Sequence, residues 1–175
     1  MSISASNETV LVTGGSGFIG THLVRQLLRQ NRRVLNVDIR PPMAREYRSF
    51  WNQIDILDAA SLLNAFEESQ PALVVHLAAR TDLDETRRIE GYAANIEGVR
   101  NVVDAVACTS SVRRTIFASS MAVCKVGYVP ADDRDYNPLT LYGESKVQTE
   151  RTVRAADGGG AEWCIVRPTT VWGPE

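Results

Sequence analysis

Cysteine and long apolar runs are scarce in this 175-residue chain. Its three cysteines are odd in number and lie mostly among apolar residues, so they are predicted to be reduced thiols packed in the core. They lack metal-ligand spacing, so no metal site is expected. No apolar run approaches the roughly 20 residues that a membrane-spanning helix needs, and residues 1–8 lack the basic-then-apolar pattern of a signal peptide. The sequence predicts a cytoplasmic protein with no membrane partner.

An excess of positive charge is also missing. The chain has 19 basic and 21 acidic residues and a net charge of −2, which gives no broad electropositive surface for nucleic acid. An anionic ligand would have to be held by local groups instead. With 44% hydrophobic residues, the chain can bury the core of one domain spanning residues 1–175.

Short β-branched runs alternate with longer segments whose apolar residues recur at helical spacing. The predicted strands are Thr9–Thr13, Arg33–Val37, Phe50–Ile54, Leu73–Leu77, Thr115–Ala118 and Trp163–Val166. The predicted helices are Phe18–Gln30, Ala59–Ser69, Tyr92–Cys108 and Leu141–Ala155. Repeated βαβ units of this kind indicate an α/β fold: a Rossmann-type doubly wound parallel sheet with helices on both faces.

The first strand runs directly into a glycine-rich turn, residues 14–20, that opens the first helix. Gly14 permits the tight turn, Gly17 lets the backbone approach a pyrophosphate, and Gly20 allows close helix–strand packing. The phosphates would face Phe18 and Ile19, where unpaired N–H groups and the helix dipole favour negative charge. Alone, such a motif also fits an ordinary glycine loop, and its position between strand and helix favours dinucleotide binding.

Asp38 ends the second strand, eighteen residues after Gly20. There a carboxylate can accept hydrogen bonds from the adenosine ribose hydroxyls. It would repel a 2′-phosphate, so the sequence favours NAD over NADP, although Arg40 could partly compensate. The alternative is that Asp38 only caps a turn.

Tyr142 and Lys146 lie at positions i and i+4 of the last predicted helix. A nearby ammonium lowers the pKa of a phenol, so Tyr142 is predicted to take a proton from a substrate hydroxyl while Lys146 holds the nicotinamide ribose. Ser120 follows the strand that ends at Ala118, at the edge where ligands of α/β sheets bind, and could orient that hydroxyl. A surface pair on an amphipathic helix is the alternative for Tyr142 and Lys146 taken alone.

In this order, the sequence segments TGGSGFIG, HLAA, YGESK and RPTTVWGP resemble the extended short-chain dehydrogenase/reductase family of NAD-dependent epimerases and dehydratases, over residues 10–174. The resemblance implies that Ser120, Tyr142 and Lys146 are catalytic and that the substrate is a nucleotide sugar. It also implies the cofactor-binding residues Gly14, Gly17, Phe18, Ile19, Gly20, Asp38, Asp55, Ile56, Leu77, Ala78, Ala79, Asn95 and Lys146. In this set Asp55 and Ile56 flank the adenine, and Asn95 fixes the geometry of the active site.

Family members continue past the last residue, Glu175, into a further strand and a substrate-binding lobe, so the resemblance implies a C-terminally truncated chain. The last strand would then have an unpaired edge.

Epimerisation, dehydration and simple oxidation all stay open as the net reaction. A non-catalytic NAD-binding module or inactive fragment is the alternative to an enzyme. The resemblance also implies a homodimer through helices 92–108 and 141–155, while burial against the sheet explains the same apolar faces.

Overall fold

Six parallel strands form one sheet in the computed structural model, which describes residues 8–156 and 160–173. The strands are β1 Thr9–Thr13, β2 Arg33–Asp38, β3 Trp51–Gln53, β4 Leu73–His76, β5 Arg114–Ala118 and β6 Glu162–Val166. Their order across the sheet is β3-β2-β1-β4-β5-β6, the order of the two mononucleotide-binding halves of a Rossmann fold. The predicted fold class is confirmed. Two expectations concern residues outside the described ones. They are the absence of a signal-peptide pattern, which rests mostly on residues 1–7, and the end of the family resemblance at Pro174.

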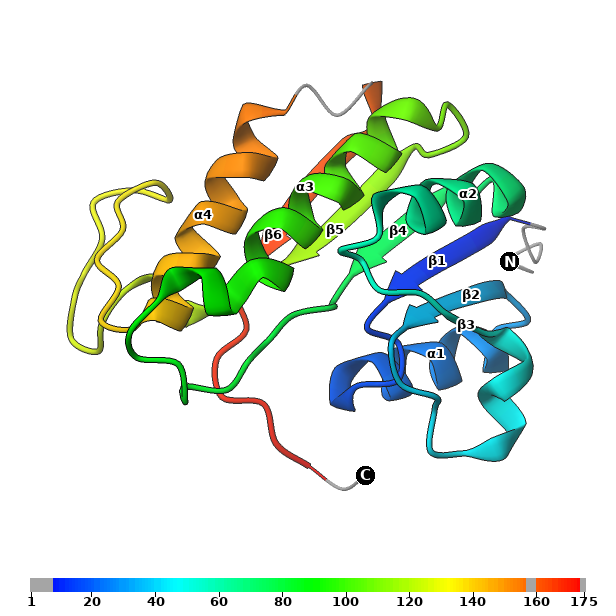
Figure 1. The fold of residues 1–175 in the computed structure, drawn as a ribbon, viewed down its shortest axis with the longest axis horizontal. Helices are drawn as coiled ribbons and strands as arrows, with labels where there is room; N and C mark the ends of the chain where they lie inside the picture. The colour runs from blue at the N-terminus through cyan, green and yellow to red at the C-terminus, as the bar shows by residue number, and fades with distance from the viewer. Residues whose placement is uncertain (1–7, 157–159, 174–175) are drawn as a thin grey trace, which may run out of the picture.

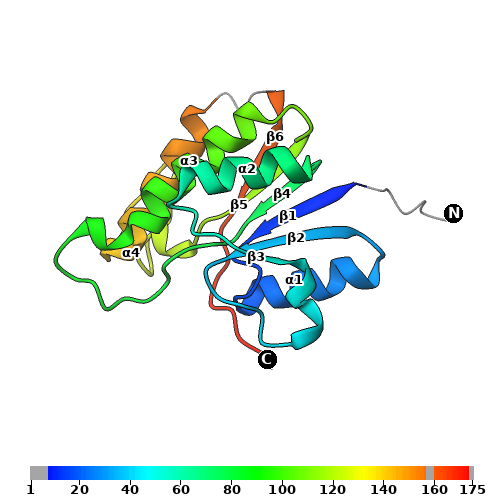
Figure 2. The same cartoon turned by 45° about the vertical axis from the view of Figure 1, so that its right-hand side comes forward.

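Helices cover both faces of this sheet. They are α1 Phe18–Arg29, α2 Ala59–Ser69, α3 Ala93–Cys108 and α4 Leu141–Ala155, with short 3-10 helices η1 Arg45–Phe50, η2 Ile89–Tyr92 and η3 Met121–Val123. Figures 1 and 2 show α2, α3 and α4 together on one face and α1 on the other. Each helix connects two parallel strands, as a βαβ crossover requires.

The boundaries of the elements follow local signals in the sequence. Asp58 caps the N-terminus of α2, where its carboxylate accepts the Ser61 amide at 3.1 Å. Thr140 caps α4, where its hydroxyl oxygen accepts the Gly143 amide at 3.0 Å. Side-chain oxygens at these positions satisfy amides that have no partner within the helix. The prediction was wrong at Tyr92, which belongs to η2 and precedes α3, and at β3, which is shorter than predicted.

Two apolar clusters form the core, one on each face of the sheet. The larger packs α2, α3 and α4 against the sheet and includes Leu11, Phe66 and Val99, and the smaller packs α1 against β1 and β2 around Val12 and Val24. Five residues of α3 and Val153 of α4 belong to the larger cluster, so burial against the sheet accounts for much of the apolar pattern of α3. The predicted homodimer stays a prediction.

The cysteines do not pack as the sequence predicts. Cys108 and Cys164 are exposed and Cys124 is half-buried, all three as free thiols. Cys108 ends α3, and Cys164 lies on β6, which is an edge strand as expected and pairs with β5. The packing interpretation was therefore wrong, because an apolar sequence neighbourhood does not determine burial at the end of a helix or the edge of a sheet. None of the helices described is long and apolar enough to cross a membrane.

Candidate active site

The carboxyl ends of the parallel strands bring the predicted site residues to one edge of the sheet. Gly14 follows β1, Asp38 ends β2, Leu77 follows β4, and Ser120 is the second residue after β5. β1 and β4 are neighbours, yet the helices that follow them, α1 and α3, lie on opposite faces (Figure 2). Such a reversal opens a crevice where ligands of doubly wound sheets bind.

Glycine is required twice in the turn after β1. Gly14 has φ of +71°, and a Cβ there would lie 2.6 Å from the backbone nitrogen of Ala78. A Cβ at Gly20 would overlap the backbone of Gly14 and Gly15. The roles predicted for Gly14 and Gly20 thus have a steric basis, because the turn, the first helix and the end of β4 touch through backbone atoms.

Gly17 is different, because a Cβ there would approach only the Gly14 carbonyl oxygen, at 3.3 Å. Gly17 is the N-terminal cap residue of α1, no side chain caps this helix, and its first turn has no acidic residue. The positive end of the helix dipole is therefore left without a side-chain partner, beside a residue whose Cβ position is approached by a single protein atom. This turn fits a pyrophosphate.

Asp38 is buried and supports the turn from β2. One carboxylate oxygen accepts the Ser16 amide and the other accepts the Arg40 amide, each at 3.0 Å. Each carboxylate oxygen has a further lone pair that can accept from a ribose hydroxyl. The side chain of Asn36 donates to the Ser16 hydroxyl at 3.0 Å, so β2 and the glycine turn are joined by side chains that the motif alone did not identify.

The remaining predicted cofactor residues lie on both sides of the crevice. Leu77 and Ala78 are half-buried beside the turn, with the Leu77 amide donating to the Thr13 carbonyl at 3.0 Å. Asp55 is exposed, whereas Ile56 is buried in the core and packs against Gly98 of α3. An adenine beside these two residues would meet the Asp55 side chain rather than that of Ile56.

His76, at the end of β4, connects the glycine turn to the catalytic side of the crevice. Its Nδ1 lies 2.7 Å from the Thr13 hydroxyl, which also accepts the Ala78 amide at 3.3 Å. The ring is fully buried, and its Nε2 has no hydrogen-bond partner among the described residues. Burial lowers the pKa of His76 to about 3, with a contribution from the charge of Lys146, so the ring is neutral at neutral pH.

The three predicted catalytic residues come together from β5 and α4. Ser120 follows β5 and caps η3, where its hydroxyl accepts the Ala122 amide at 3.1 Å. A hydrogen bond joins Ser120 to the half-buried Tyr142. The amine of the buried Lys146 donates to the Ala118 carbonyl at 2.9 Å. A hydroxyl, a phenol and an amine thus converge where β5 ends.

The protonation of Tyr142 differs from the prediction. Burial raises the phenol pKa, the hydrogen bond with Ser120 acts in the opposite direction, and Lys146 makes no contribution. The expectation that Lys146 lowers the Tyr142 pKa was therefore wrong, because the amine is directed to the Ala118 carbonyl instead. Burial lowers the pKa of Lys146 to about 8, against an opposing contribution from Glu150.

Asn95 joins the two sides of the site from α3. Its amide oxygen accepts the Arg80 amide at 2.8 Å, and its amide nitrogen donates to the Arg80 carbonyl and to the Ser145 hydroxyl, each at 2.9 Å. Ser145 is adjacent to Lys146, and Arg80 follows Ala79 of the predicted cofactor wall. Both the oxygen and the nitrogen of the Asn95 side-chain amide are bonded to protein groups, so this side chain can hold Arg80 and Ser145 in position.

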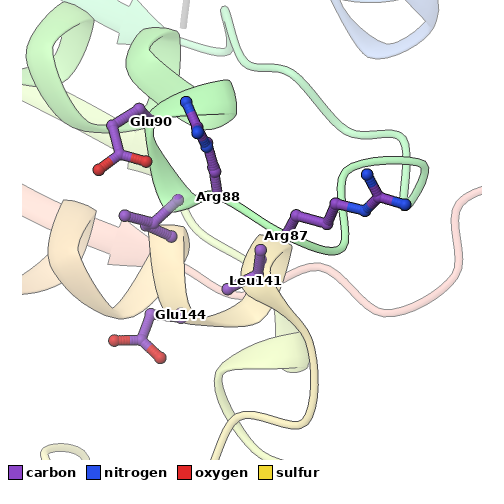
Figure 3. A pocket seen from close by; sticks show the side chains of 6 residues that line it. Arg87, Arg88, Glu90, Leu141 and Glu144 are labelled. Atoms are coloured by element: carbon purple, nitrogen blue, oxygen red, sulfur yellow. The ribbon is translucent and has the colours of Figure 1, made fainter.

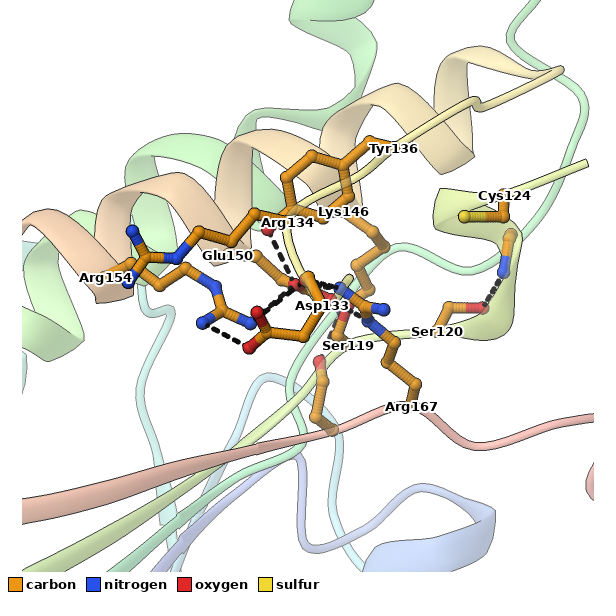
Figure 4. Close-up of polar contacts among 12 residues, drawn as sticks. Ser119, Ser120, Cys124, Asp133, Arg134, Tyr136, Lys146, Glu150, Arg154 and Arg167 are labelled. Atoms are coloured by element: carbon orange, nitrogen blue, oxygen red, sulfur yellow. Dashed lines mark hydrogen bonds and ion pairs between the residues drawn. The ribbon is translucent and has the colours of Figure 1, made fainter. Parts of the chain in front are cut away.

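Sequence reasoning missed a buried polar cluster beside the catalytic residues. Glu150 of α4 is fully buried and accepts hydrogen bonds from Ser119, Tyr136 and Arg167 (Figure 4). One available signal was the spacing of Glu150 four residues after Lys146, which places both on one side of α4. A charged residue among apolar positions of a helix needs a buried partner.

A separate cavity of about 520 Å³ lies beside the first turn of α4. Its lining residues are Arg87, Arg88, Ile89, Glu90, Leu141 and Glu144. Figure 3 shows the Arg87 side chain extending away from Glu90 and Glu144. None of the predicted site residues lines it, so it is distinct from the crevice at the strand ends.

Comparison with known proteins assigns the family. The model of the NAD dependent epimerase/dehydratase family matches residues 10–175. The chain therefore belongs to this family, which is NAD dependent, as the glycine turn and Asp38 had indicated.

Individual relatives are similar over nearly all of this chain. A 3 beta-hydroxysteroid dehydrogenase/Delta 5-->4-isomerase from Mycobacterium tuberculosis is 31% identical over 98% of this chain and 49% of its own length. The enzyme WbmG of Bordetella bronchiseptica, solved in complex with NAD, is 26% identical with a TM-score of 0.78, covering 95% of this chain and 55% of that one. A UDP-glucose 4-epimerase of Thermotoga maritima, solved with UDP-glucose, is 27% identical with a TM-score of 0.79, covering 91% and 54%. The chain spans about half the length of the curated relatives it matches.

Proposed function

We propose that this chain carries the NAD-binding and catalytic residues of a sugar-nucleotide epimerase/dehydratase-type oxidoreductase. A secondary hydroxyl of the substrate is oxidised, with Tyr142 as the base and hydride passing from the hydroxyl carbon to NAD. The convergence of Ser120, Tyr142 and Lys146 at the strand edge next to the glycine turn carries this proposal. The similarity to a UDP-glucose 4-epimerase supports the sugar-nucleotide class.

Each side chain has a distinct part in this reaction. Tyr142 takes the hydroxyl proton on its phenolate oxygen. Burial raises the pKa of this phenol, and the hydrogen bond with Ser120 opposes that rise because it stabilises the charged form. Ser120 also orients the substrate hydroxyl. Lys146 carries its charge at neutral pH and is directed at the end of β5, where it can hold a ribose. Bound NAD supplies the hydride acceptor.

A hydroxysteroid is the second candidate substrate. Three curated relatives that are 29–31% identical are 3β-hydroxysteroid dehydrogenases. Oxidation of a 3β-hydroxyl uses the same chemistry, because it also removes a proton from a secondary alcohol and a hydride from its carbon. The two candidates therefore share the roles of Ser120, Tyr142 and Lys146 and differ in the substrate.

Protein expressed from the complete gene provides the test. It is incubated with NAD and either UDP-glucose or a 3β-hydroxysteroid, and both product sugars and reduced cofactor are measured. Tyr142→Phe is expected to lower turnover by about 10²–10⁴-fold while NAD affinity stays within twofold. Turnover that is equal in both proteins contradicts the role of Tyr142. If neither protein turns over either substrate but both bind NAD, the two candidate substrates are wrong and the result favours the alternative of a non-catalytic NAD-binding module.

A further inference from the structure

Glu150 is a carboxylate in the interior of the protein, and each of its two oxygens accepts two hydrogen bonds. Its Oε1 accepts from the Ser119 hydroxyl at 2.6 Å and from Nε of Arg167 at 2.7 Å. Its Oε2 accepts from the Tyr136 hydroxyl at 3.0 Å and from Nη2 of Arg167 at 2.7 Å. The side chain is fully buried, and Figure 4 shows these partners converging on it.

The charge of Glu150 is retained despite this burial. Burial alone would raise its pKa, but the hydrogen bonds from Arg167, Ser119 and Tyr136 outweigh that effect and hold the pKa below its usual range. The two-pronged contact with Arg167 is the geometry in which a buried carboxylate is best compensated. A negative charge is thus fixed inside the protein one turn after Lys146.

The partners of Glu150 come from three different segments around the candidate active site. Ser119 directly follows β5, Arg167 directly follows β6, and Tyr136 lies in the connection before α4. The backbone completes the arrangement, because the Ser119 amide donates to the Val166 carbonyl at 2.8 Å. Glu150 therefore ties the ends of β5 and β6 to α4.

Ser119 lies between two groups that matter for the proposed reaction. On one side is Ala118, whose carbonyl accepts from the Lys146 amine, and on the other is Ser120. A shift of Ser119 would therefore move both the partner of Lys146 and the hydroxyl that bonds to Tyr142. No other side chain described in residues 8–156 and 160–173 accepts a hydrogen bond from the Ser119 hydroxyl.

We propose that Glu150 is a positioning residue for the reaction, resting on the function proposed above: its carboxylate anchors Ser119 to α4 and so holds Lys146 and Ser120 in place beside Tyr142. It acts through these residues and takes no proton from the substrate. The titratable groups nearest Lys146 are His76 on β4, which is neutral, and Tyr142 and Glu150 on α4. Arg167, Arg154 and Tyr136 lie beside Glu150, with an Arg154 nitrogen 3.6 Å from its Oε2. Glu150 is the anion among them.

Because the sequence has few lysines, the role of Glu150 can be tested without an activity assay. Lys125 and Lys146 are the only lysines in the sequence, so protein labelled with ¹³C at the lysine Cε gives one signal for each. Lys125 serves as the internal reference. A pH titration followed by NMR is run on the chain and on Glu150→Gln. The Lys146 midpoint is expected to fall by about one pH unit, roughly tenfold in its acid dissociation constant, because the stabilising anion is removed.

Glu144→Gln is the matched control, because it makes the same change at an exposed position of the same helix. It is expected to leave the Lys146 midpoint unchanged. Should Glu150→Gln not fold, Glu150→Asp serves instead, because it keeps the anion but draws it back from Ser119 by one methylene. The Ala118 carbonyl is then held less firmly against the Lys146 amine, so this variant is expected to lower the Lys146 midpoint. In protein from the complete gene it is also expected to lower kcat at least tenfold.

Two results overturn the inference. One is an unchanged Lys146 midpoint in folded Glu150→Gln, even if that variant is less stable. The other is Glu150→Asp with unchanged midpoint and kcat. The proposed function fails separately, when the unsubstituted protein binds no NAD or turns over no substrate, since the lysine titration requires neither.

Discussion

Acidification should destabilise this fold through His76. The ring is buried, its Nε2 lacks a partner within the described residues, and its Nδ1 lies 2.7 Å from the Thr13 hydroxyl. Because that hydroxyl accepts the Ala78 amide, its proton is available to Nδ1 of His76. Protonation of Nδ1 would place two donors against each other in addition to burying a charge.

The magnitude follows from the shift in pKa. The pKa of His76 is about 3 in the folded protein and 6.5 ordinarily, so between these values the unfolded chain binds more protons and stability falls as the pH falls. The loss is about 1.4 kcal/mol for each pH unit below 6.5, or about 2 kcal/mol at pH 5. The loss of stability at pH 5 is the same for any folded-state pKa of His76 well below 5.

Urea unfolding near pH 7.5 and near pH 5 measures this effect. The loss of unfolding free energy between the two should be about 2 kcal/mol smaller in His76→Gln than in the parent protein. His22→Gln is the control, because it makes the same change at the only other histidine. Equal pH dependence in the parent and in His76→Gln, or a His76 ring that titrates near 6.5 by NMR, would refute the reasoning.

Three further substitutions test the site. Asn95→Ala should lower the free energy of unfolding by about 1–3 kcal/mol in urea titrations, because buried partners lose their hydrogen bonds; a change within error would contradict its linking role. Asp38→Asn should weaken NAD binding about tenfold and raise the ratio of NADP to NAD affinity in calorimetric titrations, since the charge that repels a 2′-phosphate is removed; an unchanged ratio would place the ribose elsewhere. Gly20→Ala should cost about 1–3 kcal/mol in thermal unfolding, because its Cβ would overlap backbone atoms of the turn, and full stability would show that the turn can yield.

Local patterns were sufficient to predict the sheet and the crevice. The β1 strand and the α2 and α4 helices were predicted to the residue, because side-chain caps at Asp58 and Thr140 and runs of β-branched residues act over a few neighbours. The parallel, doubly wound sheet could be predicted from the βαβ pattern, since parallel strands and right-handed crossovers leave few arrangements.

Interactions between distant segments could not be predicted in the same way. The partners of Glu150 come from positions 119, 136 and 167, and no spacing in the sequence relates them. The direction of the Lys146 amine is set by the Ala118 carbonyl, 28 residues away, which is why the predicted effect on the Tyr142 pKa was wrong. Exposure of Cys164 depends on the position of β6 at the edge of the sheet.

Calorimetric titration of the folded chain with NAD tests the central claim most directly, with Gly17→Ala as the matched variant. A Cβ at Gly17 would meet one protein atom, the Gly14 carbonyl oxygen, in a tight contact at 3.3 Å, and it would stand where the turn is expected to receive the pyrophosphate. The account predicts saturable binding to the chain, at least about tenfold weaker binding to Gly17→Ala, and similar thermal stability for both. Correctly folded protein without measurable affinity for NAD, or equal affinity in the two proteins, would contradict it.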